Sequence, residues 1–172
     1  MTKLGWWTPC GTGGYLRLSL VAERAGQVVG HILFSDLSII TDAGTVPALA
    51  LAPMAVLPGF QKQGIGSALV RRGLDECRRQ GHQIVAVLGH PHFYRRFGFS
   101  SKLASALASP FGGGDSWMAL ELVPGALAGV AGRVEYPPPF EPVPEVRPVR
   151  PGDQAEWLRM RALLWPDCPA QQ

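Results

Sequence analysis

The sequence contains no apolar run of membrane-spanning length and no pair of cysteines at the spacing of a metal site. Its cysteines, Cys10, Cys77 and Cys168, are odd in number and far apart, which argues against a disulfide framework. His90 and His92 stand close together, but two histidines alone make a poor metal site. The N-terminus lacks the basic start and apolar stretch of a signal peptide. We therefore expect no metal, no membrane segment and a cytoplasmic location.

Charge is also scarce, since only 17% of the 172 residues are charged and the net charge is +3. An apolar content of 47% argues for one globular domain with a real core and against disorder. The basic residues form no long stripe and accompany no nucleic-acid-binding motif, so we expect no nucleic acid partner. They come in short pairs, which suit either solvated helix faces or a small anionic ligand: Arg71-Arg72, Arg78-Arg79 and Arg95-Arg96.

Hydrophobic patterning predicts strands, with a long helix after the third and a short helix before the last. Alternating residues predict strands over 15–23 and 28–39, and the apolar stretch 46–58 reads as a strand buried on both faces. Pro53 within it cannot donate to a ladder, so it predicts a bulge or a gap in pairing. Further strands over 83–89 and 116–122 and a short helix over 91–97 complete a mixed α/β architecture.

The long helix after Gly64 is predicted by its spacing. Steps of three and one give a continuous apolar face, and Gly81 stands where a helix C-terminal glycine belongs. That face comprises Gly66, Leu69, Val70, Gly73, Leu74 and Cys77.

Composition divides the chain into four parts. Residues 1–14 read as an irregular lead-in and 15–136 as the main domain. Residues 137–148 hold six prolines and predict an extended linker in polyproline II form. Residues 149–172 resemble the start of a new domain, with a short strand and a helix capped by Asp153.

Two glycines, Gly64 and Gly66, stand where a buried strand leads into the long helix. The stretch is neither a P-loop nor a dinucleotide fingerprint, because Gly-Lys-Ser/Thr and GxGxxG are both absent. Glycines there would expose unpaired N–H groups at a helix N-terminus, which favours a bound phosphate. A plain tight turn between strand and helix explains the glycines equally well.

The run Gln61-Lys-Gln-Gly64-Ile-Gly66 after a buried strand, with Tyr94-x-x-x-Gly98-Phe99 about thirty residues later, resembles the two signatures of the GNAT N-acetyltransferase superfamily. The block VLGHPHFYRRFGF is similar to a bacterial subgroup of predicted acetyltransferases, and the resemblance covers roughly 16–140. It implies an α/β (α+β) fold with a mixed, mainly antiparallel sheet flanked by helices.

The resemblance also implies acetyl-CoA as acyl donor and an amine as acceptor. The backbone N–H groups from Gln63 to Ser67 would hold the pyrophosphate, and pantetheine would pair with the open edge of the strand before them. A backbone N–H near Val56 would stabilise the oxyanion. The residues so implied in cofactor binding are Met54, Ala55, Val56, Gln61, Lys62, Gln63, Gly64, Ile65, Gly66, Ser67, Phe93 and Phe97.

Tyr94 is the implied general acid, because a phenol with a pKa near 10 stays protonated at neutral pH and can protonate a leaving thiolate. The alternative is an aromatic side chain that only packs on the sheet. The general base is left open among several residues or a chain of water molecules. The candidates are His31, Asp36, His90, His92 and Glu121.

We expect an N-acetyltransferase that moves the acetyl group to a primary amine by direct attack on the thioester. The alternative is a non-catalytic acyl-CoA-binding or interaction module left by a truncated gene fusion. Members of the family usually open with a strand and two helices, and these helices form one wall of the acceptor pocket. Only a short segment stands in that place before Leu16. The tail resembles the opening of aminoglycoside N-acetyltransferases. It is predicted to dock beside the strand at 28–34, in the same chain or in a homodimer by exchange, with a solvated tail as the alternative.

Overall fold

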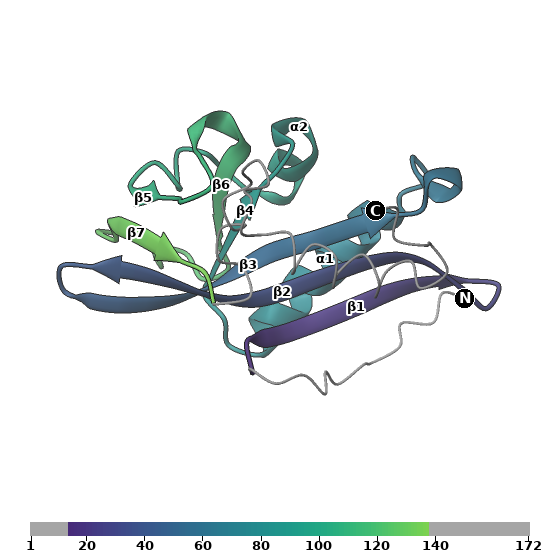
Figure 1. The fold of residues 1–172 in the computed structure, drawn as a ribbon, viewed down its shortest axis with the longest axis horizontal. Helices are drawn as coiled ribbons and strands as arrows, with labels where there is room; N and C mark the ends of the chain where they lie inside the picture. The colour runs from purple at the N-terminus through teal and green to yellow at the C-terminus, as the bar shows by residue number, and fades with distance from the viewer. Residues whose placement is uncertain (1–13, 138–172) are drawn as a thin grey trace, which may run out of the picture. The chain divides into compact units, whose positions relative to one another are not determined.

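The computed structural model describes residues 14–137, which form one curled sheet with a single long helix (Figure 1). From β1 the described chain forms three long strands, then the long helix α1, then four short strands, with single-turn helices between β4 and β5 and between β5 and β6. The strands are β1 (Leu16–Arg24), β2 (Gln27–Thr41), β3 (Gly44–Val56), β4 (Ile84–Leu88), β5 (Leu107–Ala108), β6 (Trp117–Glu121) and β7 (Gly132–Glu135). The helices are α1 (Ile65–Arg79) and α2 (Pro91–Tyr94), with 3-10 turns η1 (Pro58–Phe60), η2 (Arg95–Phe97) and η3 (Gly114–Ser116).

The sheet runs in the order β5-β7-β2-β3-β4-β6, and β1 pairs with β2 as well. Strand β2 is long enough to serve two neighbours on one side: its first part pairs with β1 and its last part, Ser38–Ile40, pairs with β7. Most pairs are antiparallel, and β3–β4 and β5–β7 are parallel. The predicted mixed, mainly antiparallel α/β fold is confirmed.

The pairing between strands β3 and β4 ends about halfway along β3. Their parallel pairing covers only Leu49 with Val85 and Ala50 with Ala86, whereas β3 continues to Val56. On its other side, β3 stays paired with β2 to its end, with one irregularity between Leu51 and Met54. There β3 advances three residues while β2 advances two, so β3 carries one extra residue at the site of Pro53. The predicted bulge is confirmed, and β3 has a free edge from Leu51 to Val56.

Helix α1 packs against one face of the sheet, behind β1, β2 and β3 in Figure 1. Its predicted apolar face is the buried one: Leu69, Val70, Gly73, Leu74 and Cys77 are buried, and Gly66 is half-buried. At Gly73 the helix meets the ring of Phe34, because a Cβ there would lie 2.5 Å from Phe34 Cε2. Gly81 adopts a positive φ of 83° after the helix, as predicted.

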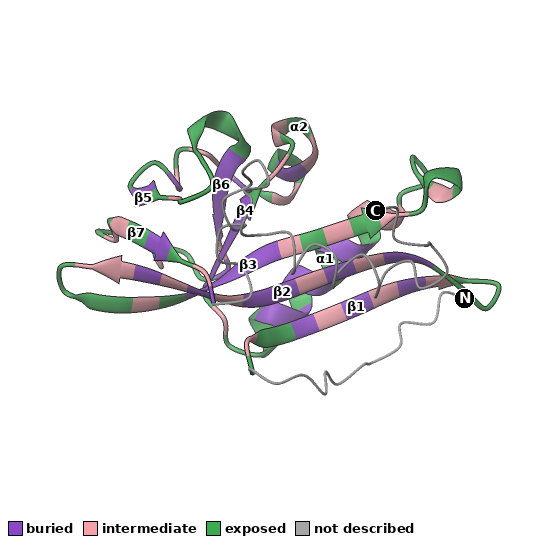
Figure 2. Ribbon diagram, viewed as in Figure 1, coloured by how far each residue is buried: buried purple, intermediate pink, exposed green. Residues whose placement is uncertain are grey.

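The opposite face of the sheet carries a second apolar cluster, which the segment from β5 to β7 covers. Trp117, Leu37 and Ile39 lie in it, and the Trp117 indole N–H donates to the Leu107 carbonyl over 2.8 Å. Buried and half-buried residues alternate along much of β1, as expected for a half-buried strand (Figure 2). Among the described residues, no helix combines the length and the apolar character needed to span a bilayer.

Three features of the fold were not predicted. The strand pair β5–β7 has two register positions, too few to leave a periodic signal. Glu76 lies on the buried face of α1, where Arg79 and Gln80 donate to its carboxylate. The turn between β1 and β2 is placed at Ala25 and Gly26, so β2 starts earlier than expected. The predicted lead-in up to residue 13, the linker beyond 137 and the docking tail lie outside the described residues.

The contact between Gly73 and Phe34 predicts the effect of adding one methyl group. Gly73→Ala should lower the free energy of unfolding by about 1–2 kcal/mol, because overpacking costs more than the roughly 1 kcal/mol of helix propensity that alanine adds. Urea denaturation measures it, with the exposed Arg72→Ala on the same helix as control. The double variant Gly73→Ala/Phe34→Leu should be more stable than the sum of the single changes predicts. Simple additivity would contradict the contact.

Candidate active site

A cavity of about 930 Å³ lies where β3 parts from β4. Three segments form it: the free end of β3, the loop that leads into α1 with the first helical turn, and the short helical segment that follows β4. The lining residues are Met54, Ala55, Val56, Phe60, Gln61, Lys62, Gly64, Ile65, Gly66, Ser67, His92, Phe93 and Arg96.

The predicted cofactor residues gather at this cavity, apart from Gln63 and Phe97. The Gln63 side chain donates to the Gly59 carbonyl and accepts from Arg24, so it points along the loop. Phe97 is half-buried behind Phe93, with ring centroids 5.4 Å apart. Both therefore support the wall without lining it.

The free edge of β3 presents backbone groups to the cavity. Leu57 donates its N–H to the Val29 carbonyl of β2, so the alternation along an antiparallel strand turns the N–H groups of Val56 and Met54 the other way. The Val56 carbonyl points to that side too, where it accepts from the Gln61 amide over 3.0 Å. Since β4 pairs no further than Ala50, these N–H groups have no partner strand among residues 14–137.

The first turn of α1 supplies a second set of backbone donors. Ala68 is the first residue to donate to a turn carbonyl, that of Gly64, so no carbonyl of the described chain accepts from Ile65, Gly66 or Ser67. Gly64 takes a φ of +84° and Lys62 one of +59°, which turns the chain sharply into the helix. The first turn contains no acidic side chain. Unpaired N–H groups and the positive end of the helix dipole both face the cavity.

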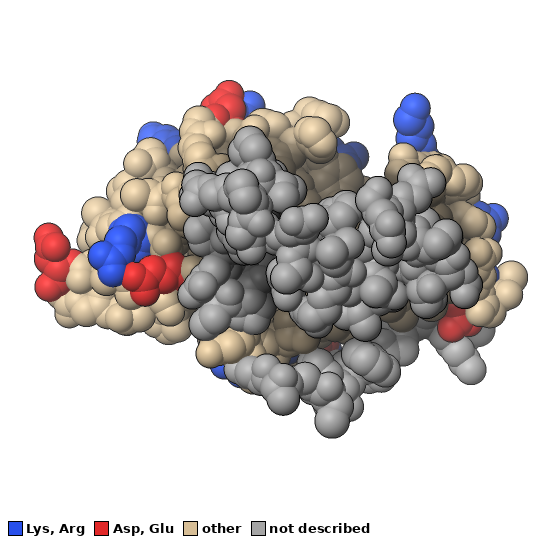
Figure 3. Space-filling view, viewed as in Figure 1, with Lys and Arg blue, Asp and Glu red and all other residues tan. Residues whose placement is uncertain are grey.

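Arginines surround this helix end, and sequence reasoning did not assign them to the site. Arg96 lines the cavity, Arg24 donates to Gln63 over 2.6 Å, and Arg71 lies 5.5 Å from the Phe97 ring. The signal was available, because Arg71 and Arg96 belong to two of the basic pairs. On the visible face, basic side chains project near the loop that follows β3 (Figure 3).

Tyr94 lies in the wall behind the cavity lining and is only 7% exposed. Its ring makes edge contacts with Phe93 and Phe99 at centroid distances of 5.0 and 5.6 Å. A Cβ on Gly89 would come 2.5 Å from Tyr94 Cε2, so the glycine after β4 leaves room for the ring. Burial raises the pKa of the Tyr94 phenol above its usual value. The phenol is therefore protonated at neutral pH.

The structure separates the candidates for a general base. Asp36 forms a two-point ion pair with Arg17, at 2.6 and 2.5 Å, and Glu121 accepts from the backbone N–H groups of Gly125 and Leu127. Both carboxylates therefore stabilise the fold through these contacts and are poor candidates for the general base. Of the five candidates, the structure brings His92 alone to the cavity lining.

His31 reaches the same region from β2. It lies opposite Ala55, a lining residue, in the β2–β3 register, and its Nε2 is 2.9 Å from Ser19 Oγ. His90 is exposed and does not line the cavity; its carbonyl accepts from the backbone N–H groups of Phe93 and Tyr94.

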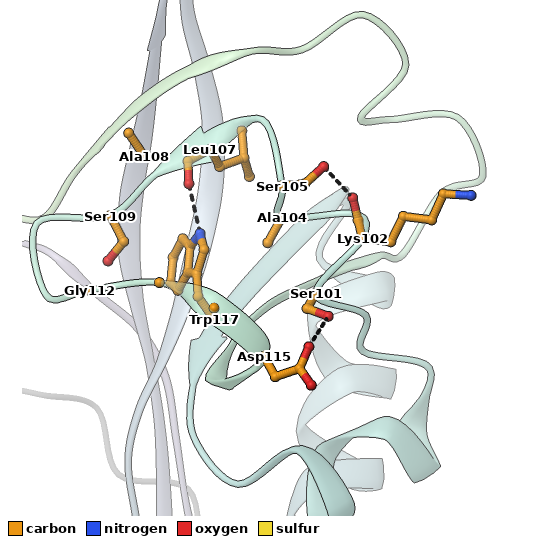
Figure 4. Close-up of a pocket in the computed structure, with 12 residues that line it drawn as sticks. Ser101, Lys102, Ala104, Ser105, Leu107, Ala108, Ser109, Gly112, Asp115 and Trp117 are labelled. Atoms are coloured by element: carbon orange, nitrogen blue, oxygen red, sulfur yellow. Dashed lines mark hydrogen bonds between the residues drawn. The ribbon is translucent and has the colours of Figure 1, made fainter.

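A second cavity, of about 700 Å³, lies beside β5 and β6 and contains none of the predicted site residues (Figure 4). Its polar groups largely satisfy one another. Ser101 donates to Asp115, which also pairs with Arg95, and Ser105 donates to the Lys102 carbonyl. The free backbone donors and Arg96, which only neutral groups among residues 14–137 hold, lie at the first cavity, which is therefore the candidate active site.

A family model described as an acetyltransferase (GNAT) domain matches residues 16–101, from β1 through the Tyr94 segment. The chain belongs to the GNAT acetyltransferase family. The N-acetyltransferase YhbS of Escherichia coli K12 is 36% identical over 125 residues, which are 72% of this chain and 74% of YhbS. A second E. coli N-acetyltransferase, YjhQ, is 43% identical over 82 residues, and the match spans only 45% of the length of YjhQ.

Solved structures of GNAT proteins share the fold. The crystal structure of E. coli YhbS in complex with CoA has a TM-score of 0.65 at 35% identity, with 72% of this chain and 68% of that one covered. A GNAT acetyltransferase of Brucella melitensis in complex with acetyl-CoA has a TM-score of 0.58, also at 35% identity, with 74% and 70% covered. Both matches exceed the length of the family-model match.

The raised pKa of Tyr94 predicts how this phenol titrates. The absorbance difference at 295 nm between wild type and Tyr94→Phe should appear only above the ordinary phenol pKa of about 10. Because the fold favours the neutral phenol, this contribution to stability is complete below pH about 10 and is lost as the pH rises beyond it. Wild type should therefore lose unfolding free energy more steeply than Tyr94→Phe above pH 10. Titration of Tyr94 below pH 10 would contradict its burial.

Proposed function

We propose that this protein is an acetyl-CoA-dependent N-acetyltransferase that transfers the acetyl group to a primary amine. The observation that carries the proposal is one cavity that joins the unpaired amides of a helix N-terminus to the free edge of β3. A CoA thioester has matching parts: a pyrophosphate for the helix end, and a pantetheine arm whose amides can pair with a strand. The similar proteins of E. coli and B. melitensis were crystallised with CoA and acetyl-CoA.

In the proposed complex the pyrophosphate lies on the N–H groups from Gln63 to Ser67, and Gln61 and Lys62 stand at its rim. Pantetheine runs along β3 and takes the place that β4 leaves, where it pairs with the outward backbone groups of Met54 and Val56. The Gln61 amide already occupies the Val56 carbonyl. Pantetheine would therefore either displace this amide or pair with the N–H groups alone.

The proposed reaction is a direct transfer. The amine nitrogen attacks the thioester carbonyl, and the Val56 N–H stabilises the oxyanion that forms. The C–N bond forms and the C–S bond breaks. The amine loses a proton to His92, His31 or water, and the CoA sulfur takes one from the Tyr94 phenol.

A non-catalytic acyl-CoA-binding module is the competing function. The observation in its favour is that Tyr94 is not among the cavity-lining residues, so its ring can be read as core packing alone. Turnover separates the two functions, since both predict cofactor binding.

Cofactor binding is tested at Gly66. A Cβ there would lie 3.5–3.8 Å from Phe93, Val56 and Met54, so the protein itself tolerates it, but the branched side chain would occupy the cavity. Gly66→Val should weaken CoA binding by at least tenfold in titration calorimetry, with little change in melting temperature.

The matched control is Gly59→Ala, because a Cβ at Gly59 meets nothing within 4 Å. It should bind CoA like wild type. A folded wild-type protein that gives neither heat nor a thermal shift with CoA would disprove the proposed function.

Catalysis is tested at Tyr94. Tyr94→Phe should reduce thiol release from acetyl-CoA by about 10²–10⁴-fold, the usual contribution of a general acid, while CoA affinity stays within about twofold. The acceptors to test are spermidine, kanamycin and a lysine-containing peptide. Binding without turnover on any amine would favour the module, and equal rates for both proteins would assign Tyr94 to packing.

A further inference from the structure

Arg96 lines the candidate active site, and no carboxylate within residues 14–137 pairs with it. Its guanidinium donates through Nε to the Phe93 carbonyl over 3.2 Å and through Nη2 to Ser67 Oγ over 3.3 Å. It lies 4.8 Å from the centroid of the Phe93 ring and 5.5 Å from that of Phe97. These contacts hold the cation in place by neutral groups alone.

The neighbouring residue, Arg95, differs from Arg96 because it has an acidic partner. Arg95 pairs with Asp115 over 3.2 Å, and four other described arginines, Arg17, Arg78, Arg79 and Arg133, also have carboxylate partners. Arg96 instead bonds a hydroxyl in the first turn of α1, at the positive end of the helix dipole. A cation at that end is repelled by the dipole, and the described residues provide no anion to offset it.

Two more guanidinium groups share this situation. Arg24 is held by Gln63 and lies 5.9 Å from the Phe60 ring, and Arg71 lies 5.5 Å from the Phe97 ring. Aromatic rings and amides thus orient three cations near one helix N-terminus. Such a cluster attracts a multivalent anion, because each added negative charge is stabilised by all the cations.

We propose that Arg96 is a binding residue for the pyrophosphate of the CoA thioester, where it completes the site that the α1 amides begin. The inference rests on the proposed function. Of the three arginines, Arg96 is the one that can contact the ligand directly, because Arg24 and Arg71 do not line the cavity. The guanidinium has five N–H donors and uses two of them, which leaves three for phosphate oxygens. The planar guanidinium can contact two phosphate oxygens at once, and the Phe93 ring and carbonyl hold it at the cavity.

The pyrophosphate is a more suitable partner for Arg96 than the ribose 3′-phosphate. The hydroxyl that Arg96 contacts belongs to Ser67, whose own N–H is one of the unpaired amides of the first helical turn. An anion that reaches those amides also reaches Arg96. In CoA the ribose separates the 3′-phosphate from the pyrophosphate. The site formed by the α1 amides and Arg96 can therefore bind one of these two groups but not both.

Calorimetric titration of CoA and of dephospho-CoA, which lacks the 3′-phosphate, tests this assignment. Arg96→Gln should weaken both ligands equally, by about 10–100-fold, the range for loss of charged hydrogen bonds. Arg96→Lys keeps the charge but not the fork and should fall in between. The control Arg95→Gln, in the adjacent exposed residue, should change neither affinity by more than about twofold. Unchanged melting temperatures would confirm that the variants are folded.

The outcomes are distinct. A loss for CoA alone would show that Arg96 binds the 3′-phosphate and would overturn the pyrophosphate assignment. Wild-type affinity for both ligands in Arg96→Gln would overturn the role of Arg96 and leave the proposed function standing. A wild-type protein that binds neither ligand would overturn the proposed function, and the role of Arg96 with it.

Discussion

The separation of β3 from β4 is the constraint on which the rest of the site depends. Two strands that stayed paired to their ends would satisfy each other's backbone groups and leave no cavity. Here the pairing stops at Ala50, while β2 keeps the remainder of β3 in the sheet. The extra residue at Pro53 bends β3 at this point, and proline provides no N–H for a continued ladder. The result is a strand that is held in the sheet on one side and free on the other, as a ligand that pairs like a strand requires.

The same separation determines where the helix N-terminus lies. Since β3 ends at Val56 and α1 starts at Ile65, the loop between them is short, and it keeps the first helical turn beside the free strand edge. The cavity therefore combines two kinds of unpaired donor, one along a strand and one at a helix end. Neither the strand edge nor the helix end would by itself indicate which ligand binds. Together they suit a long ligand with an anionic end and an amide-bearing arm.

The sequence predicted the fold and the strand–helix frame well, because these depend on local patterns. The apolar steps of α1, the proline in β3 and the glycines before α1 each have one dominant structural consequence. Prediction failed where an outcome depends on partners distant in sequence. Whether Arg95 or Arg96 finds a carboxylate depends on Asp115, and whether Gln63 lines the cavity depends on Arg24. The same holds for the general base. Two of its five candidates, Asp36 and Glu121, became less suitable only because the fold pairs Asp36 with Arg17 and Glu121 with the Leu127 N–H.

The segment after β4 links the two halves of the proposed chemistry. Phe93 contacts Tyr94 through its ring and Arg96 through both its ring and its carbonyl, so the proposed acid and the proposed phosphate partner share one support. Gly89 precedes this segment and admits the Tyr94 ring against the end of β4. An anion that draws Arg96 toward α1 would act on Phe93, and Phe93 packs directly against Tyr94. The segment Pro91–Phe97 therefore carries both the proposed acid and the proposed phosphate partner, and both side chains contact Phe93.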